Sequence, residues 1–357
     1  MAEKQIANLR MVAWELTRSC NLSCSHCRAS SRYGPYPGEL TTDECFKLID
    51  DIVSFSKPVI ILTGGEPLLR KDIFEIAEYG KSKGLTMVMS PNGTLLTDEN
   101  VKKIMNSGIK RISVSLDGPD AASHDDLRQV SGAFERACAG IERARASGLE
   151  FQINTTVTKR NIKLLPETMR LAKDLGAKAH HIFLLVPTGR AKEMTEEELS
   201  ASEYEEALKL LAGEKKDSSL EIKITCAPHF NRVLLQERAA TAPILTGRGC
   251  MGGVSFCFIS HVGDAQPCGY LEIKCGNVLK KAFKDIWFGS EVFNSIRDFG
   301  QYKGKCGLCE FKTVCGGCRA RAYAKYNDYL REEPYCAYEP KFPVIARARS
   351  ARSNLKK

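Results

Sequence analysis

The cysteines place the strongest constraint on what this chain can fold into. The 357 residues include 15 cysteines, of which 12 fall into two groups, while Cys45, Cys138 and Cys226 are isolated and are most simply buried small hydrophobes. Cys20, Cys24 and Cys27 lie together, and nine more crowd the stretch from Cys250 to Cys336. The number is odd, so an all-disulfide scheme would leave one thiol unpaired. The chain is also too long and too dilute in cysteine to be a small disulfide scaffold. We therefore expect a reducing compartment, where thiols bind metal or act in catalysis.

The rest of the composition predicts a cytoplasmic protein with a sizeable core. Hydrophobic residues make up 43% of the chain, and 52 Lys and Arg against 43 Asp and Glu give a net charge of +9. This charge favours an acidic small ligand. No apolar run approaches the ~18 residues of a membrane helix, and the charged N-terminus does not resemble a signal peptide. The basic stretch from Arg347 to Lys357 predicts a flexible tail, and we expect no nucleic-acid partner.

The body of the chain alternates β-rich runs with stretches of helical periodicity. Helical spacing is clear at Cys45, Leu48, Ile49 and Ile52, and Thr97 followed by Asp98 and Glu99 is typical of a helix start. Strands each followed by a helix predict an α/β architecture with a parallel sheet, although the alternation alone does not separate an open sheet from a barrel. The six predicted strands are Met11–Thr17, Val59–Thr63, Thr86–Ser90, Arg111–Leu116, Phe151–Val157 and His181–Val186.

The first cysteine group directly follows the first predicted strand. Its spacing, C-x3-C-x2-C, can hold three irons of a cubane 4Fe–4S cluster and leave the fourth iron open for another ligand. Zinc is the alternative. However, a structural zinc site needs four closed ligands, and only His26 is near enough to add one.

Ligand-binding residues are expected where parallel strands end. Thr63-Gly64-Gly65-Glu66-Pro67 ends the second strand, where two glycines permit close backbone approach to a ligand and Glu66 can accept a hydrogen bond from an amine. Four polar residues at or near the ends of later strands are further candidates, although Ser115 and Asp117 alone could simply form a turn: Asn92, Ser115, Asp117 and Asn154.

Together, the C-x3-C-x2-C loop and the Gly-Gly-Glu-Pro turn resemble the core of the radical S-adenosylmethionine (SAM) enzymes. The resemblance implies a partial (β/α)6 barrel. It also implies that Cys20, Cys24 and Cys27 bind a 4Fe–4S cluster whose open iron chelates S-adenosylmethionine. The implied cofactor-binding residues are Gly64, Gly65, Glu66, Pro67, Asn92, Ser115, Asp117 and Asn154. No residue is assigned a catalytic role at this stage.

The second cysteine group contains two paired C-x2-C loops, which also occur in zinc ribbons. It resembles the small SPASM/Twitch-like extension that holds one or two auxiliary 4Fe–4S clusters. The resemblance implies a first cluster on Cys250, Cys257, Cys268 and Cys318 and a second on Cys306, Cys309, Cys315 and Cys336. One spacing departs from the family, because two residues rather than three separate Cys315 from Cys318. The expected domains are a barrel at 10–225, the cysteine-rich domain at 226–340 and the tail at 341–357.

Local sequence marks, among them Trp14-Glu-Leu-Thr-Arg18 and Pro267-Cys-Gly-Tyr-Leu271, resemble the branch of the family that acts on tetrapyrroles. The implied reaction is oxidative decarboxylation of two propionates of iron-coproporphyrin III to vinyl groups, forming haem b. Alternatives within the branch are decarboxylation of didecarboxysirohaem acetates or a haem d1-type step. We expect an iron-tetrapyrrole substrate, a reducing donor such as ferredoxin or flavodoxin, and a monomer.

Two further alternatives come from other classes of protein. A peptide-modifying maturase shares both cysteine modules, but only 19 residues precede Cys20, too few for the leader-binding domain that many maturases carry. A non-enzymatic electron carrier has no need of the Gly-Gly-Glu-Pro turn. For the tetrapyrrole reading, the candidate partners of the propionates are Arg28, Lys159, Arg160, Arg190, Arg319 and Arg321, and the candidate ligands of the substrate iron are His180, His181, His229 and His261.

Overall fold

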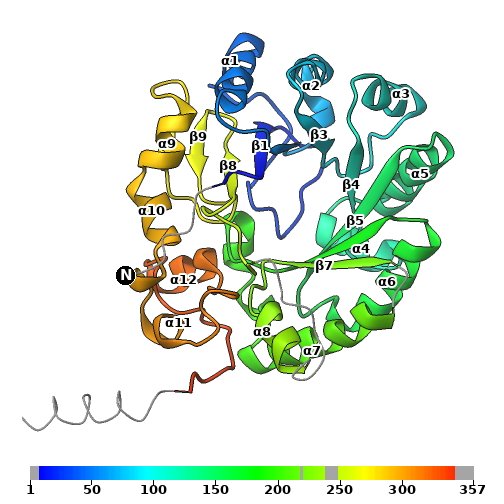
Figure 1. The fold of residues 1–357 in the computed structure, drawn as a ribbon. Helices are drawn as coiled ribbons and strands as arrows, with labels where there is room; N and C mark the ends of the chain where they lie inside the picture. Colours follow the sequence, from blue (N-terminus) through cyan, green and yellow to red (C-terminus); the bar gives the residue numbers. More distant parts are fainter. Residues whose placement is uncertain (1–7, 218–219, 238–247, 342–357) are drawn as a thin grey trace, which may run out of the picture.

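The structure is a computed structural model that describes residues 8–217, 220–237 and 248–341. The predicted basic tail falls almost wholly outside the described residues. Figure 1 shows a curved sheet with helices on its outer side and an additional helical region at one edge.

One ten-stranded sheet runs through the molecule in the order β10-β9-β8-β1-β2-β3-β4-β5-β6-β7. Strands β1 to β7 are all parallel to their neighbours. β7 and β8 are not paired with each other, so the sheet forms a partial barrel rather than a closed one. The first seven strands are β1 (Met11–Thr17), β2 (Val59–Gly64), β3 (Thr86–Met89), β4 (Arg111–Ser115), β5 (Glu150–Val157), β6 (Ala179–Leu184) and β7 (Glu221–Thr225).

The parallel α/β architecture predicted from the sequence is confirmed, and β7 is an additional strand that the prediction missed. The outer helices bury one stripe each, and Thr97 caps α3 as expected by accepting a hydrogen bond from the Asn100 N–H. Figure 1 shows α1, α2, α3, α5 and α6 on the outer side of the sheet. The helices of this part are α1 (Thr42–Val53), α2 (Ile73–Ser82), α3 (Asp98–Asn106), α4 (Ala121–Arg128), α5 (Ala133–Ala146), α6 (Leu165–Asp174), α7 (Ala201–Asp217) and α8 (Phe230–Glu237).

The main core lies between the sheet and these outer helices. On β5, Phe151, Ile153 and Val157 belong to this core, so the alternate residues Gln152 and Asn154 point to the inner face of the barrel. On β6, Ile182 and Leu184 face the core and His181 faces inward by the same alternation. The inner face of β5 and β6 therefore presents Gln152, Asn154 and His181, together with the ring of Phe183.

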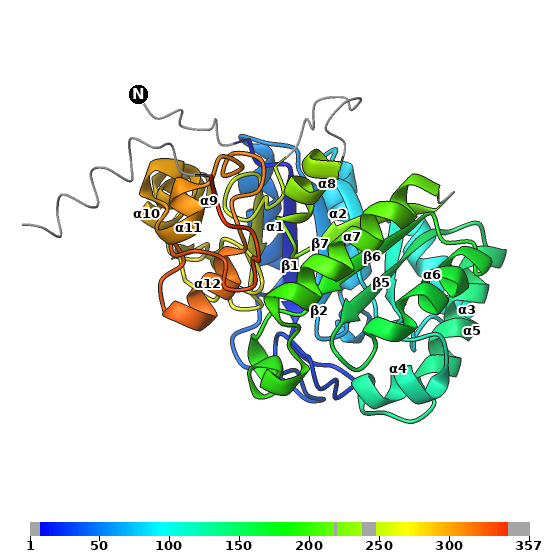
Figure 2. The same cartoon turned by 90° about the horizontal axis from the view of Figure 1, so that it is seen from below.

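The C-terminal region is joined to the barrel through the sheet itself. Strand β8 (Phe256–Ile259) pairs in parallel with β1, so the sheet continues past the predicted domain boundary at residue 225. Both views place the orange helices together on the side of β8, away from α5 and α6 (Figures 1 and 2). The elements are β9 (Asp264–Gln266), β10 (Gly276–Asn277), α9 (Phe283–Gly289), α10 (Glu291–Arg297), α11 (Gly304–Leu308) and α12 (Arg319–Tyr326).

Within the described residues, no helix has both the length and the apolar character needed to span a membrane.

Candidate iron–sulfur and S-adenosylmethionine site

The three N-terminal cysteines lie on the loop between β1 and α1. Cys20 and Cys24 are buried and Cys27 is half-buried, in a small apolar cluster with Val130 and Ala133. Burial raises the pKa of the Cys20 thiol to about 12. Backbone N–H groups already point at the sulfurs, as that of Leu22 does at Cys20 Sγ, 3.4 Å away. The residues fit a bound cluster, because a metal deprotonates the thiols it binds and N–H donors stabilise the resulting thiolates.

The Gly-Gly-Glu-Pro turn lies directly against this loop. The Gly65 N–H donates to the Thr17 carbonyl at 2.7 Å, and the Glu66 N–H donates to the Ser19 carbonyl at 2.8 Å. A Cβ atom at Gly65 would lie 2.3 Å from the Ser19 oxygen. The sequence suggested that these glycines allow close approach to a ligand. In the structure they allow close approach of the turn to the backbone that leads into Cys20.

Glu66 is fully buried and its carboxylate accepts two backbone N–H groups. These come from Asn92 at 2.7 Å and Leu68 at 3.1 Å. Burial raises the pKa of the Glu66 carboxyl to about 7. In the part of the chain that the structure describes, no ion pair to a Lys, Arg or His is formed by Glu66. A buried carboxylate beside Cys20 without a cation partner suits the amine of a ligand.

The other predicted strand-end residues divide into two groups. Ser115 and Asn154 are register partners on β4 and β5 and lie side by side on the inner face. Asn92 and Asp117 instead bind the protein itself. The Asn92 side-chain amide donates to Asn21 Oδ1 at 2.8 Å, which ties the end of β3 to the cysteine loop. Asp117 is fully buried beside Arg128, with 2.7 Å between its Oδ2 and Arg128 Nη2.

Most of the cations predicted to meet substrate carboxylates are already engaged. Arg28 forms a 2.8 Å ion pair with the buried Glu15, and Arg190 donates to the Cys24 and Ser31 carbonyls at 2.7 and 2.8 Å. Arg160 pairs with Glu197 and Asp126 at the surface. The others are Lys159, 3.9 Å from Glu203, and Arg319 and Arg321, both buried in the C-terminal region.

Of the four predicted histidines, His181 alone is placed by the strand alternation on the polar inner face. Its register partners are Asn154 and Lys223. Burial lowers the pKa of His181 to about 4, so its imidazole is neutral at neutral pH. His180 lies 2.7 Å from Thr155 Oγ1, His261 lies 2.8 Å from Glu15, and His229 lines the cavity of the second cysteine set.

The four cysteines predicted for the second auxiliary cluster line one cavity in the C-terminal region: Cys306, Cys309, Cys315 and Cys336. N–H donors again point at sulfur. The Glu333 backbone donates to Cys306 Sγ at 3.3 Å, and the Arg319 guanidinium lies 3.6 Å from the same atom. Within the described residues, no group of three His, Cys, Asp or Glu converges closely enough for a single metal ion.

The four cysteines predicted for the first auxiliary cluster do not all lie together. Cys318 belongs to one buried apolar cluster, and Cys226 and Cys268 both pack against it. The Cys250 sulfur and the Cys268 Cβ both lie within 3.6 Å of the Cβ position of Gly252. Cys257, in contrast, is buried on β8 in the core between sheet and helices, where its thiol donates to the Gln266 carbonyl at 3.4 Å.

The unusual spacing between Cys315 and Cys318 has a local explanation. Both intervening residues are glycines with positive φ, 76° at Gly316 and 64° at Gly317. Consecutive left-handed residues turn the backbone sharply, which only glycine does at low cost. The short link therefore still directs Cys315 to one cysteine set and Cys318 to the other.

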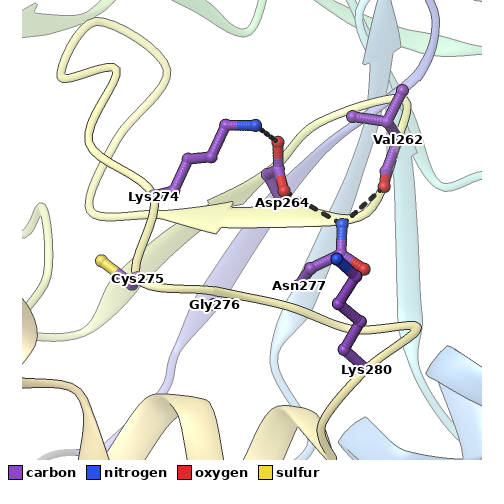
Figure 3. Close-up of a pocket in the computed structure, with 7 residues that line it drawn as sticks. All are labelled: Val262, Asp264, Lys274, Cys275, Gly276, Asn277 and Lys280. Carbon is purple, nitrogen blue, oxygen red and sulfur yellow. Dashed lines mark hydrogen bonds and ion pairs between the residues drawn. The ribbon is translucent and has the colours of Figure 1, made fainter.

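A separate surface hollow lies at the β10 edge of the sheet (Figure 3). Its polar groups bind one another. Lys274 pairs with Asp264 at 2.7 Å, and the Asn277 amide donates to Asp264 Oδ1 at 3.0 Å and to the Val262 carbonyl at 2.8 Å. Cys275 borders this hollow, and burial raises its pKa to about 12. These contacts stabilise a turn and do not form a recognisable ligand site.

Comparison with known protein families agrees with this geometry. Residues 14–172 match the family model of the radical SAM superfamily, and residues 250–318 match that of an iron–sulfur cluster-binding domain, SPASM. A solved structure of Streptococcus suis SuiB bound to S-adenosylmethionine aligns with a TM-score of 0.74 and 16% identity over 94% of this chain and 78% of that one. The fold and the site thus define a radical SAM enzyme whose cofactors are S-adenosylmethionine and 4Fe–4S clusters.

Two curated relatives identify the branch of this superfamily. Both are named AdoMet-dependent heme synthase and are 50% identical to this chain. One, from Nitratidesulfovibrio vulgaris, aligns over 93% of each chain, and the other, from Methanosarcina barkeri, over 93% of this chain and 97% of its own. A second M. barkeri protein, named Fe-coproporphyrin III synthase, is 30% identical over 91% of this chain and 87% of its own. The chain belongs to the family of the AdoMet-dependent heme synthases.

Proposed function

We propose that this enzyme converts two propionate side chains of iron-coproporphyrin III to vinyl groups and thereby forms haem b. One observation carries the choice of substrate. M. barkeri contains both a heme synthase and an Fe-coproporphyrin III synthase, and this chain shares 50% of its residues with the first and 30% with the second. The predicted alternative, decarboxylation of didecarboxysirohaem, is correspondingly less well supported.

The reaction balances with S-adenosylmethionine as the oxidant. Each propionate loses carbon dioxide, one hydrogen atom and one electron, and each S-adenosylmethionine takes up one electron and yields methionine and 5′-deoxyadenosine. When bound at a reduced 4Fe–4S cluster, S-adenosylmethionine supplies the 5′-deoxyadenosyl radical that accepts the hydrogen. Two propionates therefore need two S-adenosylmethionine molecules for each haem.

The residues of the barrel would bind and orient the reactants. Cys20, Cys24 and Cys27 would hold the radical-forming cluster, and the buried carboxylate of Glu66 would accept hydrogen bonds from the methionine amine beside it. Ser115 and Asn154 are adjacent on the inner face and can bind the polar groups of the same ligand. His181, neutral and next to Lys223 in register, is the histidine best placed to meet the substrate on that face.

The C-terminal region would take up the electron that leaves the substrate. An iron–sulfur cluster can accept one electron, whereas zinc has no redox chemistry. We assign the second auxiliary cluster to the cavity lined by Cys306, Cys309, Cys315 and Cys336. We assign the first to Cys250, Cys268, Cys318 and Cys226. The proximity of these four residues supports this set, and the burial of Cys257 in the main core counts against that residue as a ligand.

The decisive experiment is anaerobic incubation of the reconstituted enzyme with reductant, S-adenosylmethionine and each candidate tetrapyrrole, followed by mass analysis. Iron-coproporphyrin III should lose two carbon dioxides through a singly decarboxylated intermediate, with two 5′-deoxyadenosines per haem. Turnover of didecarboxysirohaem with inert iron-coproporphyrin III would instead reassign the substrate. We further propose a cytoplasmic monomer reduced by a ferredoxin or flavodoxin, with a barrel at 10–225 and a cysteine-rich domain at 226–340.

A further inference from the structure

Arg128 is a buried cation beside one of the expected cluster ligands. It is the last residue of α4 and is 8% exposed. Its Nη1 lies 3.7 Å from Cys24 Sγ, and this contact meets the geometric criteria of a hydrogen bond to sulfur. Neither the cysteine spacing nor the Gly-Gly-Glu-Pro turn points to this residue, which lies more than a hundred positions further along the chain.

The other side of the same guanidinium is held by Asp117. Arg128 Nη2 lies 2.7 Å from Asp117 Oδ2. The Asp117 carboxylate is itself fixed, because its Oδ1 accepts the Thr156 N–H at 2.8 Å. Asp117 Oδ2 also lies 3.4 Å from Nε2 of His26 on the cysteine loop, so the carboxylate holds the arginine from a position beside that loop.

The loop that carries Cys24 is also fastened to the end of α4. The Ser25 N–H donates to the Leu127 carbonyl at 2.9 Å, and the Ser25 hydroxyl donates to the same oxygen at 3.2 Å. These two hydrogen bonds join the residue after Cys24 to the residue before Arg128, and so hold the two side chains near each other. A preorganised donor of this kind loses little entropy when its hydrogen bond forms.

The electrostatic consequence follows from the burial of the pair. Reduction adds one electron to a 4Fe–4S cluster, and a nearby positive charge or N–H donor to sulfur stabilises that added charge. The effect is stronger in a buried site than at a surface, because little water screens it. Arg128 presents Nη1 to the sulfur and pairs through Nη2 with Asp117, and the direct N–H contact to sulfur outweighs the opposing charge of the more distant carboxylate.

We propose that Arg128 is a positioning residue that raises the reduction potential of the radical-forming cluster through its hydrogen bond to Cys24, and that Asp117 holds it there. This inference rests on the proposed function only for the assignment of Cys24 as a cluster ligand. It concerns how readily the cluster is reduced and is independent of which tetrapyrrole reacts.

The test is a redox titration of the reconstituted full chain, monitored by electron paramagnetic resonance without any tetrapyrrole. The radical-forming cluster is recognised as the one whose signal changes when S-adenosylmethionine is added. In Arg128→Met, the ratio of reduced to oxidised cluster at a fixed potential should fall at least tenfold, equivalent to a shift of about −59 mV for one electron. Arg128→Lys should restore part of this loss.

Arg70→Met is a matched control. Arg70 also pairs with an aspartate, Asp72, and its Nη2 lies 3.6 Å from the sulfur of Cys45, which is not an expected ligand. Its loss should leave the ratio unchanged. The proposal is overturned if Arg128→Met keeps the wild-type ratio, or if Arg70→Met shifts it equally. If Arg128→Met fails to bind iron, the neutral but polar variant Arg128→Gln takes its place: a fall in the ratio supports the proposal, and a wild-type ratio overturns it.

If the wild-type enzyme forms no haem but Arg128→Met shows the expected fall in the reduced-to-oxidised ratio, the proposed function is contradicted and this inference stands. Conversely, haem formation by the wild-type enzyme with no shift in Arg128→Met would remove only the role of Arg128.

Discussion

The barrel loop and the C-terminal cysteine region bring thiols together in different ways. In the loop, three cysteines within eight residues share one apolar pocket, so local chain geometry gathers them. In the C-terminal region, the proposed first set draws on segments far apart in the sequence, since Cys226 directly follows β7 of the barrel and packs against the cluster that contains Cys318. The first site is a property of a short loop, whereas the second depends on the complete tertiary structure.

The largest expected effect is the loss of the cluster in the barrel loop while the clusters of the C-terminal region remain. Replacing Cys20, Cys24 and Cys27 together by alanine should abolish cleavage of S-adenosylmethionine, because no cluster with an open iron remains. The auxiliary clusters should stay, at about eight irons per chain. The measurements are 5′-deoxyadenosine by chromatography and iron by chemical assay. Continued formation of 5′-deoxyadenosine would show that the radical site lies elsewhere.

The next effect tests which cysteines bind the first auxiliary cluster: the set proposed from tertiary contacts, with Cys226, or the set predicted from sequence order, with Cys257. Cys226→Ala should lose one cluster, about four irons, because this thiol packs against the set formed with Cys268 and Cys318. Cys257→Ala is the matched control, since that thiol donates to the Gln266 carbonyl within the core. Iron content and Mössbauer spectra would decide. Loss of iron from Cys257→Ala alone would restore the ligand set predicted from sequence order.

A smaller effect is expected at the turn beside the barrel loop. Glu66→Gln keeps the shape of the side chain, removes its charge and leaves one of the two backbone N–H groups facing an amide nitrogen that cannot accept. The hydrogen bond to the methionine amine therefore loses its charge assistance. S-adenosylmethionine affinity should fall 10- to 150-fold, which corresponds to about 1.5–3 kcal/mol. Equilibrium binding would measure the affinity for S-adenosylmethionine, and full iron loading of the variant is the control. Unchanged affinity would contradict the role of Glu66 in binding the amine. The auxiliary clusters should be unaffected.

The smallest effect is a pH dependence of S-adenosylmethionine binding that arises from the same residue, Glu66. Because burial raises the pKa of Glu66 to about 7, the carboxylate that binds the amine becomes protonated as the pH falls through 7. Affinity for S-adenosylmethionine should therefore decrease up to tenfold per pH unit below that value and level off above it. Glu66→Gln should show a flat profile from pH 6 to 8. A sloping profile in that variant would assign the titration to another group.

The same raised pKa affects folding with a defined sign. A carboxyl that is protonated more readily in the folded protein than in the unfolded chain destabilises the fold as the pH rises between the two pKa values. In the protein without its cofactors, the contribution of Glu66 should favour folding near pH 4 and lose that advantage by pH 7. Glu66→Gln should remove this slope from chemical denaturation curves measured at several pH values.

Local patterns explain most of what the sequence predicted correctly. Strands β1 to β6 were found because apolar runs and turn residues mark them. β7 was missed although Glu221-Ile-Lys-Ile-Thr225 alternates in the same way, and with it the position of Cys226. The pairing of β8 with β1 is not local, because more than two hundred residues separate the strands. Sequence spacing carries no information on such a contact.

Asp117 shows that the position of a residue in the sequence does not fix what its side chain contacts. It stands at a strand end, where ligands are expected, and the sequence therefore suggested a cofactor contact. The structure turns its carboxylate toward Arg128, whose own direction depends on how α4 packs. Gly64 and Gly65 are comparable. Their need for space was visible in the sequence, but the backbone that occupies it, at Thr17 and Ser19, was not.

The pairing of β8 with β1 also bears on how the protein is made. During synthesis β1 emerges first, yet the partner that covers one of its edges is among the later parts of the chain to leave the ribosome. Until then β1 exposes unpaired N–H and C=O groups that can recruit another chain. A nascent or truncated chain that ends before Phe256 should therefore aggregate or recruit chaperones, and the barrel should become fully protected only once the cysteine-rich region has been synthesised.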